Sequence, residues 1–277
     1  MPRLLAALCL TASVIVAAPA AAEGRHALVI GNAGYANVPS LANPVNDARL
    51  MARTLEEAGF RVTALAEADG ARMRAGVERF RDRLGEAGEG AVALFYFAGH
   101  GVRSDGFNYL LPVDVDIRAE ADIAAEAVAA EWVLDRMRAP GVASIMVLDA
   151  CRNNPFAADG RVPDLGDGLA RMTVRDDHLI AYATGPGDVA LDGTGDHSPY
   201  TAALARAIRE PGLDVHTVFE RVREEVETAT GGFQVPWERS SIDTVLALRP
   251  LARPARSAAG KAADDRAGGP SLGLTVG

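Results

Sequence analysis

Short apolar segments alternate with segments of helical periodicity along most of the chain, and this alternation constrains the fold more than any other feature. Between the apolar runs, residues 46–58 and 73–84 place apolar side chains every three or four positions, as on one face of a helix. Strands that alternate with helices form parallel sheets that are covered on both faces. The sequence therefore predicts an α/β fold, a three-layer sandwich with a mostly parallel, about six-stranded sheet flanked by helices on both faces. The predicted strands include the apolar runs at residues 25–30, 61–65, 91–97, 143–148 and 179–183.

The remaining elements complete this pattern. Asn46 is expected to cap the first helix, because an asparagine side chain accepts bonds from the free N–H groups of a first turn. Residues 152–177 form a long polar segment, and loops of that length in compact domains are usually functional. The further expected elements are helices at residues 124–138, 199–208 and 214–229, a hairpin arm at 108–113 and a last strand at 241–248.

The two ends of the chain do not belong to the predicted domain, which we place at residues 23–250. Residues 1–22 have a positive charge at Arg3, a short apolar core and a small-residue end, which is the order of a secretory signal peptide cleaved after Ala22. The apolar run is too short for a good membrane anchor. We therefore expect a periplasmic or secreted protein with no membrane anchor after cleavage. Residues 251–277 have little to bury and are predicted to form a disordered tail.

Charge and composition exclude some partners. The formal net charge is -9 with no run of Lys or Arg, and aromatic residues make up 5% of the chain. Such a chain offers neither attraction for a phosphate backbone nor a base-stacking surface, so nucleic acid is not expected as a partner. Cleavage after Ala22 would remove Cys9 and leave Cys151 as the sole cysteine, which rules out an internal disulfide. The sequence does not determine the oligomeric state.

Two residues that can carry nucleophilic catalysis follow the ends of apolar strands. His100 and Cys151 each come after the carboxyl end of such a strand. Because the carboxyl ends of parallel strands meet at one edge of the sheet, we expect the two side chains to lie close together. An imidazole that manages protons beside a thiolate that attacks is the minimum for this chemistry. The backbone N–H groups of Gly101 and Cys151 are expected to form an oxyanion hole.

His-Gly at 100–101 after one hydrophobic strand, and Asp-Ala-Cys-Arg at 149–152 after another, resemble the caspase and metacaspase superfamily of cysteine peptidases. Caspases have their histidine about 50 residues upstream of the cysteine, as here. The likeness covers roughly residues 25–248. It includes the opening strand at 27–32, Asn-Asp-Ala at 46–48 and Ser-Pro-Tyr-Thr at 198–201.

The resemblance implies an endopeptidase that acts on peptide or protein substrates through a Cys–His dyad, with no metal at the reacting atoms. It assigns Cys151 as the nucleophile and His100 as the general acid and base. No cofactor is expected. Calcium activation is common among metacaspases, but the acidic clusters on which it depends cannot be assigned in this sequence.

Specificity is the finer implication of the resemblance. Metacaspases cut after Arg or Lys, and Asp149 matches the pocket aspartate that lies two residues before their nucleophile. Asp47 matches a second pocket acid of metacaspases more loosely. It lies in the first turn of a predicted helix, where a carboxylate stabilises the helix through its dipole whether or not it binds substrate. Arg152 departs from the metacaspase pattern, because metacaspases usually have His at this position. Arg is the residue found there in animal caspases, which cut after Asp. If the specificity is basic, self-cleavage is expected in the long polar segment at Arg161, Arg171 or Arg175.

Two other functions compete with this interpretation. A caspase-like binding or scaffold module with little or no catalysis is the first, although both positions of the dyad are filled. The second is a flavodoxin-like or nucleotide-binding α/β domain. It is disfavoured because Gly-Asn-Ala-Gly at 31–34 lacks the third glycine of a dinucleotide fingerprint. The other loop histidine, His197, is interpreted as part of a solvated turn, and His26, His178 and His216 as structural or surface residues.

Overall fold

One sheet lies at the centre of the molecule, and a path of six strands runs through it in the order β2-β1-β3-β6-β7-β8. Neighbours along this path are parallel from β2 to β7, and the edge strand β8 is antiparallel to β7. The predicted α/β fold with a mostly parallel sheet is confirmed. The six strands are β1 (Arg25–Gly31), β2 (Arg61–Ala66), β3 (Ala91–Ser104), β6 (Val142–Cys151), β7 (His178–Tyr182) and β8 (Trp237–Ser240).

The structure is a computed structural model that describes residues 24–151, 154–157, 160–162, 165 and 168–251. The predicted signal peptide at 1–22 lies outside these residues, as does the predicted tail apart from Leu251. Within the described residues, no helix has both the length and the apolar character needed to cross a membrane.

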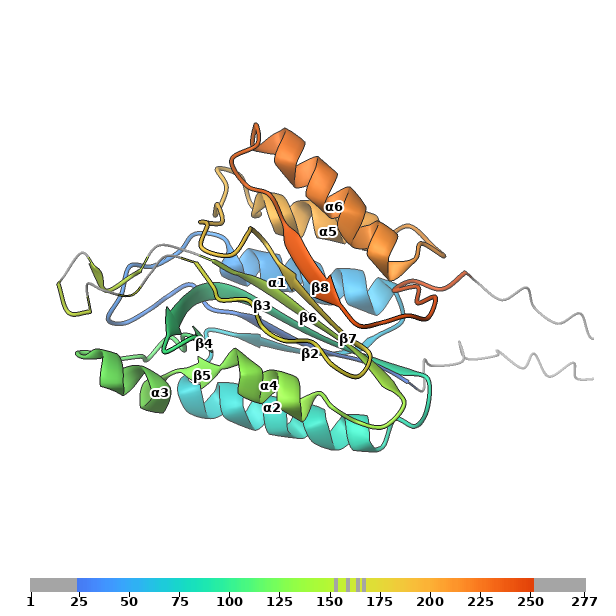
Figure 1. The fold of residues 1–277 in the computed structure, drawn as a ribbon, viewed down its shortest axis with the longest axis horizontal. Coiled ribbons are helices and arrows are strands. Elements are labelled where there is room, and N and C mark those ends of the chain that lie inside the picture. The colour runs from blue at the N-terminus through green and yellow to red at the C-terminus, as the bar shows by residue number, and fades with distance from the viewer. Residues whose placement is uncertain (1–23, 152–153, 158–159, 163–164, 166–167, 252–277) are drawn as a thin grey trace, which may run out of the picture.

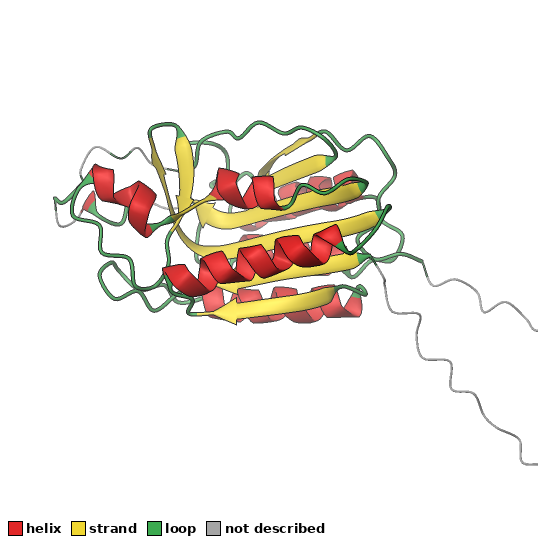
Figure 2. Ribbon diagram, turned by 90° about the horizontal axis from the view of Figure 1, so that it is seen from below, coloured by secondary structure: helices red, strands yellow, loops and turns green. Residues whose placement is uncertain are grey.

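Helices cover both faces of the sheet and make three layers (Figure 1). Helices α1, α5 and α6 lie on one face, while α2, α3 and α4 lie on the other, where Figure 2 shows them in front of the strands. The bounds of the helices are α1 (Pro44–Glu57), α2 (Gly70–Gly85), α3 (Ile123–Glu126), α4 (Ala130–Arg136), α5 (Pro199–Ile208) and α6 (Val215–Ala229).

The central strands are apolar because both of their faces are covered. Leu94, Phe95, Tyr96 and Phe97 in β3 are all fully buried. Burial of each such side chain stabilises the fold by about 1.5–3 kcal/mol relative to exposure. A second, smaller apolar cluster joins the loops beyond the carboxyl ends of the strands, and Tyr35 and Phe156 belong to it. These loops are therefore packed together by a core of their own.

Strand β3 runs well past its apolar segment and turns back as a hairpin. Asp105 and Gly106 have φ angles of 49° and 80°, the left-handed conformation that a two-residue turn between antiparallel strands requires. Strand β4 (Phe107–Leu110) then pairs with the end of β3, so the predicted hairpin arm is present but begins one residue earlier than expected.

The helix predicted at residues 124–138 is wrong as a single element. The chain forms α3, then the two-residue strand β5 (Val128–Ala129), then α4. Ala127 is extended, with φ -96° and ψ 175°, and Val128 pairs with Leu110 of β4. Sheet pairing by a β-branched residue therefore overrides the helical period of this segment.

The last strand predicted at residues 241–248 is also wrong, because β8 comes earlier in the chain. Trp237 of β8 pairs in register with Tyr182, and their ring centroids are 5.4 Å apart. Cross-strand aromatic pairs stabilise a sheet and favour this register. Ile242 and Leu248, which give the later segment its apolar pattern, are buried without belonging to a strand.

The first helix begins two residues before the predicted cap at Asn46. Pro44 occupies its first turn, where a missing N–H costs nothing. Asn43 at the cap position makes no side-chain capping bond to α1. Its Nδ2 donates instead to the carbonyl oxygens of Asp192 and Gly195. This arrangement ties the start of α1 to the loop that precedes α5.

Candidate active site

A bulge in β3 places the predicted catalytic histidine. Ala98 pairs with Asp149 of β6, but the next pair is Gly101 with Cys151, so β3 contains one residue more than β6 over this stretch. A bulge of this kind bends the strand and re-aims its side chains, and such bulges are common beside active sites. His100 lies within the bulge, directly before the residue that pairs with Cys151.

The imidazole of His100 is held on two sides. Its Nε2 lies 2.7 Å from the carbonyl oxygen of Pro39, and its ring centroid is 4.7 Å from that of Tyr35. A carbonyl oxygen can only accept a hydrogen bond, so Nε2 carries the proton of the neutral ring. Nδ1 is then the basic nitrogen. The side chain is 5% exposed, and burial in this packed position limits its freedom to rotate.

Tyr35 also fixes the backbone of the bulge. The His100 N–H donates to the Tyr35 hydroxyl at 2.8 Å, and this hydroxyl in turn donates to the Leu111 carbonyl oxygen. Gly99 must be glycine for this contact, because a Cβ atom there would lie 2.5 Å from the Tyr35 hydroxyl oxygen. The loop after β1 therefore supplies the contacts of Pro39 and Tyr35 with the imidazole ring.

This loop is anchored to the strands behind it. The N–H groups of Ala33 and Gly34 donate to the Glu67 carboxylate, and the fully buried Asn32 side chain donates to the carbonyl oxygens of Ala68 and Leu111. Each charged or buried bond of this kind contributes about 1–3 kcal/mol. The start of the loop that carries Tyr35 is thus tied to its neighbours, although much of the loop is exposed.

Cys151 is the last residue of β6 and the register partner of Gly101. The backbones of the two strands are close here, since a Cβ atom on Gly101 would lie 2.8 Å from the carbonyl oxygen of Ala150. The side chain of Cys151 lies outside the described part of the structure, so the predicted contact with His100 and the oxyanion hole of Gly101 and Cys151 stay predictions.

Asp149 lies buried between the sheet and the start of α5, with 1% of its surface exposed. Its Oδ2 accepts hydrogen bonds from the hydroxyl groups of Ser198 at 2.5 Å and Thr201 at 2.9 Å. The Ser198 hydroxyl also caps α5 by accepting from the Thr201 N–H. The carboxylate thereby binds the first turn of this helix to β6.

Asp47 is equally buried, and it faces the same segment from α1. Its Oδ1 accepts hydrogen bonds from the Ser198 N–H and from Nδ1 of His197, both at 3.1 Å. Ser198 therefore bonds to both predicted pocket acids, one through its backbone and one through its hydroxyl. The structure brings Asp47 and Asp149 together around one residue. His197 belongs to this network and not to a fully solvated turn.

The two carboxylates have an electrostatic effect on Tyr96 in β3. Burial, and then the negative charges of Asp149 and Asp47, raise the pKa of Tyr96 well above its usual range. Tyr96 stays protonated for this reason, and its hydroxyl lies 2.5 Å from that of Thr201. Since Thr201 already donates to Asp149, Tyr96 is the donor of this pair. A chain of hydroxyl groups thus converges on Asp149.

The three arginines predicted as self-cleavage sites differ in accessibility. The guanidinium of Arg161 donates to the carbonyl oxygens of Ile117 and Asn37, and that of Arg171 lies 5.3 Å from the centroid of the Trp237 ring. Arg175 is exposed. It lies directly before Asp176 and Asp177, both of which have positive φ angles. Arg171 is exposed as well, whereas Arg161 is partly buried.

The contacts made by several residues of the site could not be predicted from the sequence. Tyr35 and Pro39 lie in an irregular loop whose approach to His100 depends on the bulge. Ser198 has a local signal, because a serine before Pro199 is a typical helix cap. Its bonds to Asp47 and Asp149, however, join segments about 150 and 50 residues apart. Among the described residues, no group of three or more His, Cys, Asp or Glu side chains is arranged to hold a metal ion.

An α/β sandwich with a histidine and a cysteine on adjacent strand ends defines the class of caspase-like proteins, and comparison with known families agrees. The family model described as the caspase domain, Peptidase_C14, matches residues 24–246, so the chain belongs to this family. The predicted resemblance is confirmed. Members of the family are cysteine peptidases that act on protein substrates.

Two curated relatives are similar to this chain over part of its length. It is 28% identical over 174 residues to the human mucosa-associated lymphoid tissue lymphoma translocation protein 1, and 28% identical over 174 residues to the mouse homologue. The match covers 62% of this chain but only 20% and 19% of the two relatives. The chain therefore spans about a fifth of the length of these proteins.

Proposed function

We propose that the protein is an exported cysteine endopeptidase that uses a Cys151–His100 dyad and cuts after Arg or Lys. The observation that carries the dyad is the bulge, which seats His100 beside the backbone position of Cys151. The hydrogen bond from Nε2 of His100 to the Pro39 carbonyl oxygen supports His100 as the base of the dyad, because it leaves Nδ1 free of a proton. Export rests on the predicted signal peptide at residues 1–22.

The proposed reaction follows from these roles. Nδ1 of His100 takes the proton of the Cys151 thiol, and the thiolate attacks the carbonyl carbon of the scissile bond. The N–H groups of Gly101 and Cys151 stabilise the oxyanion that forms. The imidazolium then protonates the leaving amine, and a thioester remains. His100 finally activates a water molecule, which hydrolyses the thioester and restores the thiol.

The basic specificity rests on the two buried acids. Asp47 and Asp149 come from different elements and both bond to Ser198 near the carboxyl end of the sheet. Paired carboxylates attract a guanidinium or ammonium group and repel an acidic side chain, and a buried site strengthens both effects. A substrate Arg or Lys would replace part of the present network, including the bond from His197 to Asp47.

Paired fluorogenic peptides test this specificity. The chain beginning at Glu23 should hydrolyse a peptide that ends in Arg at least about 100-fold faster than its counterpart ending in Asp, because one buried like-charge contact costs several kcal/mol. The two peptides differ only in this residue, and each is measured with and without calcium. Selective turnover of the Asp peptide would support the peptidase activity but contradict the proposed acidic pocket.

Self-cleavage after Arg175 is a further consequence of basic specificity. Intact-mass analysis after incubation should show two fragments that meet at the bond between Arg175 and Asp176, since Arg175 is exposed whereas the guanidinium of Arg171, also exposed, lies over the Trp237 ring. Arg175→Gln should prevent this cut. Arg161→Gln is the matched control and should not, because the Arg161 side chain is held by two carbonyl oxygens. A single uncut wild-type chain after long incubation would count against the prediction.

A further inference from the structure

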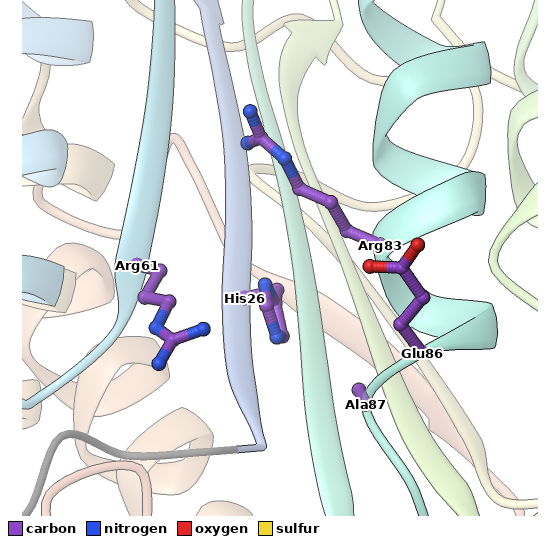
Figure 3. Close-up of a pocket in the computed structure, with 5 residues that line it drawn as sticks. All are labelled: His26, Arg61, Arg83, Glu86 and Ala87. Atoms are coloured by element: carbon purple, nitrogen blue, oxygen red, sulfur yellow. The ribbon is translucent and has the colours of Figure 1, made fainter.

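A polar cavity lies at the end of the sheet opposite to His100 and Cys151. It has a volume of about 490 Å³ and is lined by His26, Arg61, Arg83, Glu86 and Ala87 (Figure 3). His26 stands near the start of β1, whose far end leads into the loop that contacts His100. The cavity is therefore separate from the candidate active site.

Two neighbouring strands and one helix supply the basic groups that line the cavity. His26 of β1 and Arg61 of β2 are register partners, so their side chains lie on the same face of the sheet. Arg83 reaches this face from α2, and its guanidinium donates to Thr63, which follows Arg61 by two positions on β2. Three different elements thus contribute a basic side chain to one cavity.

These basic groups lack a counterion within the described part of the chain. No Asp or Glu there forms an ion pair with Arg61 or Arg83, although other arginines of α2 and α4 have such partners, for example Arg81 with Glu78. Glu86 lines the cavity but is paired with neither guanidinium. The cavity consequently carries an excess of positive charge in a protein whose net charge is -9.

His26 is the buried polar group of the cavity. Its side chain is 6% exposed, and among the described residues its Nδ1 has no hydrogen-bond partner. A buried polar atom without a partner costs about 1–3 kcal/mol, so such atoms are rare unless a ligand or water satisfies them. Burial, then the positive charges of Arg61 and Arg83, lower the pKa of His26.

We propose that this cavity binds a phosphate group, either as free phosphate or on a small molecule, with the Arg61 guanidinium on its oxygens, His26 beside it and Arg83 as a second positive charge in the lining. Guanidinium groups present several N–H donors in a planar fork that matches a phosphate. The volume suits a small-molecule ligand rather than a bare ion alone. A dianion outweighs the repulsion from the single carboxylate of Glu86, whereas the attraction for a singly charged carboxylate is weaker.

Titration of His26 by NMR at increasing inorganic phosphate tests the site directly. Bound phosphate should raise the pKa of His26 by about 1 or more, because an opposite charge replaces the two guanidiniums as its dominant neighbour. Sodium chloride at matched ionic strength is the control for screening, and acetate for a singly charged oxyanion. A pKa of His26 that changes equally in phosphate and in chloride would overturn the proposal.

Variants of the lining residues distinguish phosphate binding in this cavity from a general effect of protein charge on phosphate affinity. Arg61→Gln should weaken phosphate binding about tenfold or more, the loss of one bond to a charged group. Glu86→Gln should strengthen it several-fold, because it removes the opposing charge. Arg79→Gln removes the same charge from an exposed position on α2 outside the cavity lining and should have little effect. Equal weakening by Arg61→Gln and Arg79→Gln would contradict a specific site.

Phenyl phosphate distinguishes the two sources of the phosphate group. Tighter binding of phenyl phosphate than of inorganic phosphate indicates a phosphorylated small molecule, and the reverse indicates the free ion. Either result supports the proposal, whereas binding of neither probe overturns it. Calorimetry gives both affinities, and thermal unfolding confirms that each variant is folded.

Discussion

Replacing Cys151 with Ala should abolish hydrolysis of an Arg-ending peptide, with kcat lowered by about 10⁴-fold or more. The substitution removes the nucleophile, and the remaining backbone donors can only position the substrate. His100→Ala should lower kcat by a similar factor, because without Nδ1 no base takes the proton of the thiol. Fluorogenic peptide assays measure both losses, and thermal unfolding shows that the variants remain folded.

The double variant Cys151→Ala with His100→Ala provides a sharper result. Residues that act as one catalytic unit are strongly non-additive, so the double variant should be about as inactive as either single variant. Losses that multiply would indicate that the two residues act separately. A wild-type protein that cleaves no peptide, with or without calcium, would instead favour the binding or scaffold module.

Removing the Asp149 carboxylate should affect both stability and specificity. Asp149→Ala leaves the buried hydroxyl groups of Ser198 and Thr201 without their acceptor, and each lost bond to a charged group contributes about 1.5–3 kcal/mol. The free energy of unfolding should fall by about 3–5 kcal/mol, measured by denaturant titration. Hydrolysis of the Arg peptide should fall with it.

Asp149→Asn separates the two effects. An asparagine oxygen can still accept from Ser198 and Thr201, so the loss of stability should be smaller than with Ala. The negative charge is removed, however, and the preference for Arg over Asp should fall at least about tenfold. An Asn variant that keeps the full preference would show that Asp149 has a purely structural role and that the pocket lies elsewhere.

The apolar patterns of the sequence predict the sheet and most of its helices. Five strands and the helix at Pro199–Ile208 lie where the apolar pattern indicates. The failures have a common cause. Val128 and Trp237 enter strands because of partners far away in the sequence, Leu110 and Tyr182, which no local pattern reveals.

The candidate site is also predictable only in part. The rule that parallel strand ends share an edge places His100 and Cys151 at the same edge of the sheet without a structure. That their strands, β3 and β6, are neighbours is seen only in the structure. The bulge is not predictable in this way, because it is a difference in residue count between two strands. Tyr35, which depends on that bulge for its contact with His100, is hidden for the same reason.

Ser198 joins the cap of α5 to both predicted pocket acids, and this has a consequence for how the protein can evolve. A substitution at Asp47 or Asp149 that alters substrate preference also removes an anchor of α5. New specificities would therefore have to arise together with a second change that restores the start of this helix. The acids that would select the substrate also support the fold, so the substrate preference of such a protein should drift slowly along a lineage.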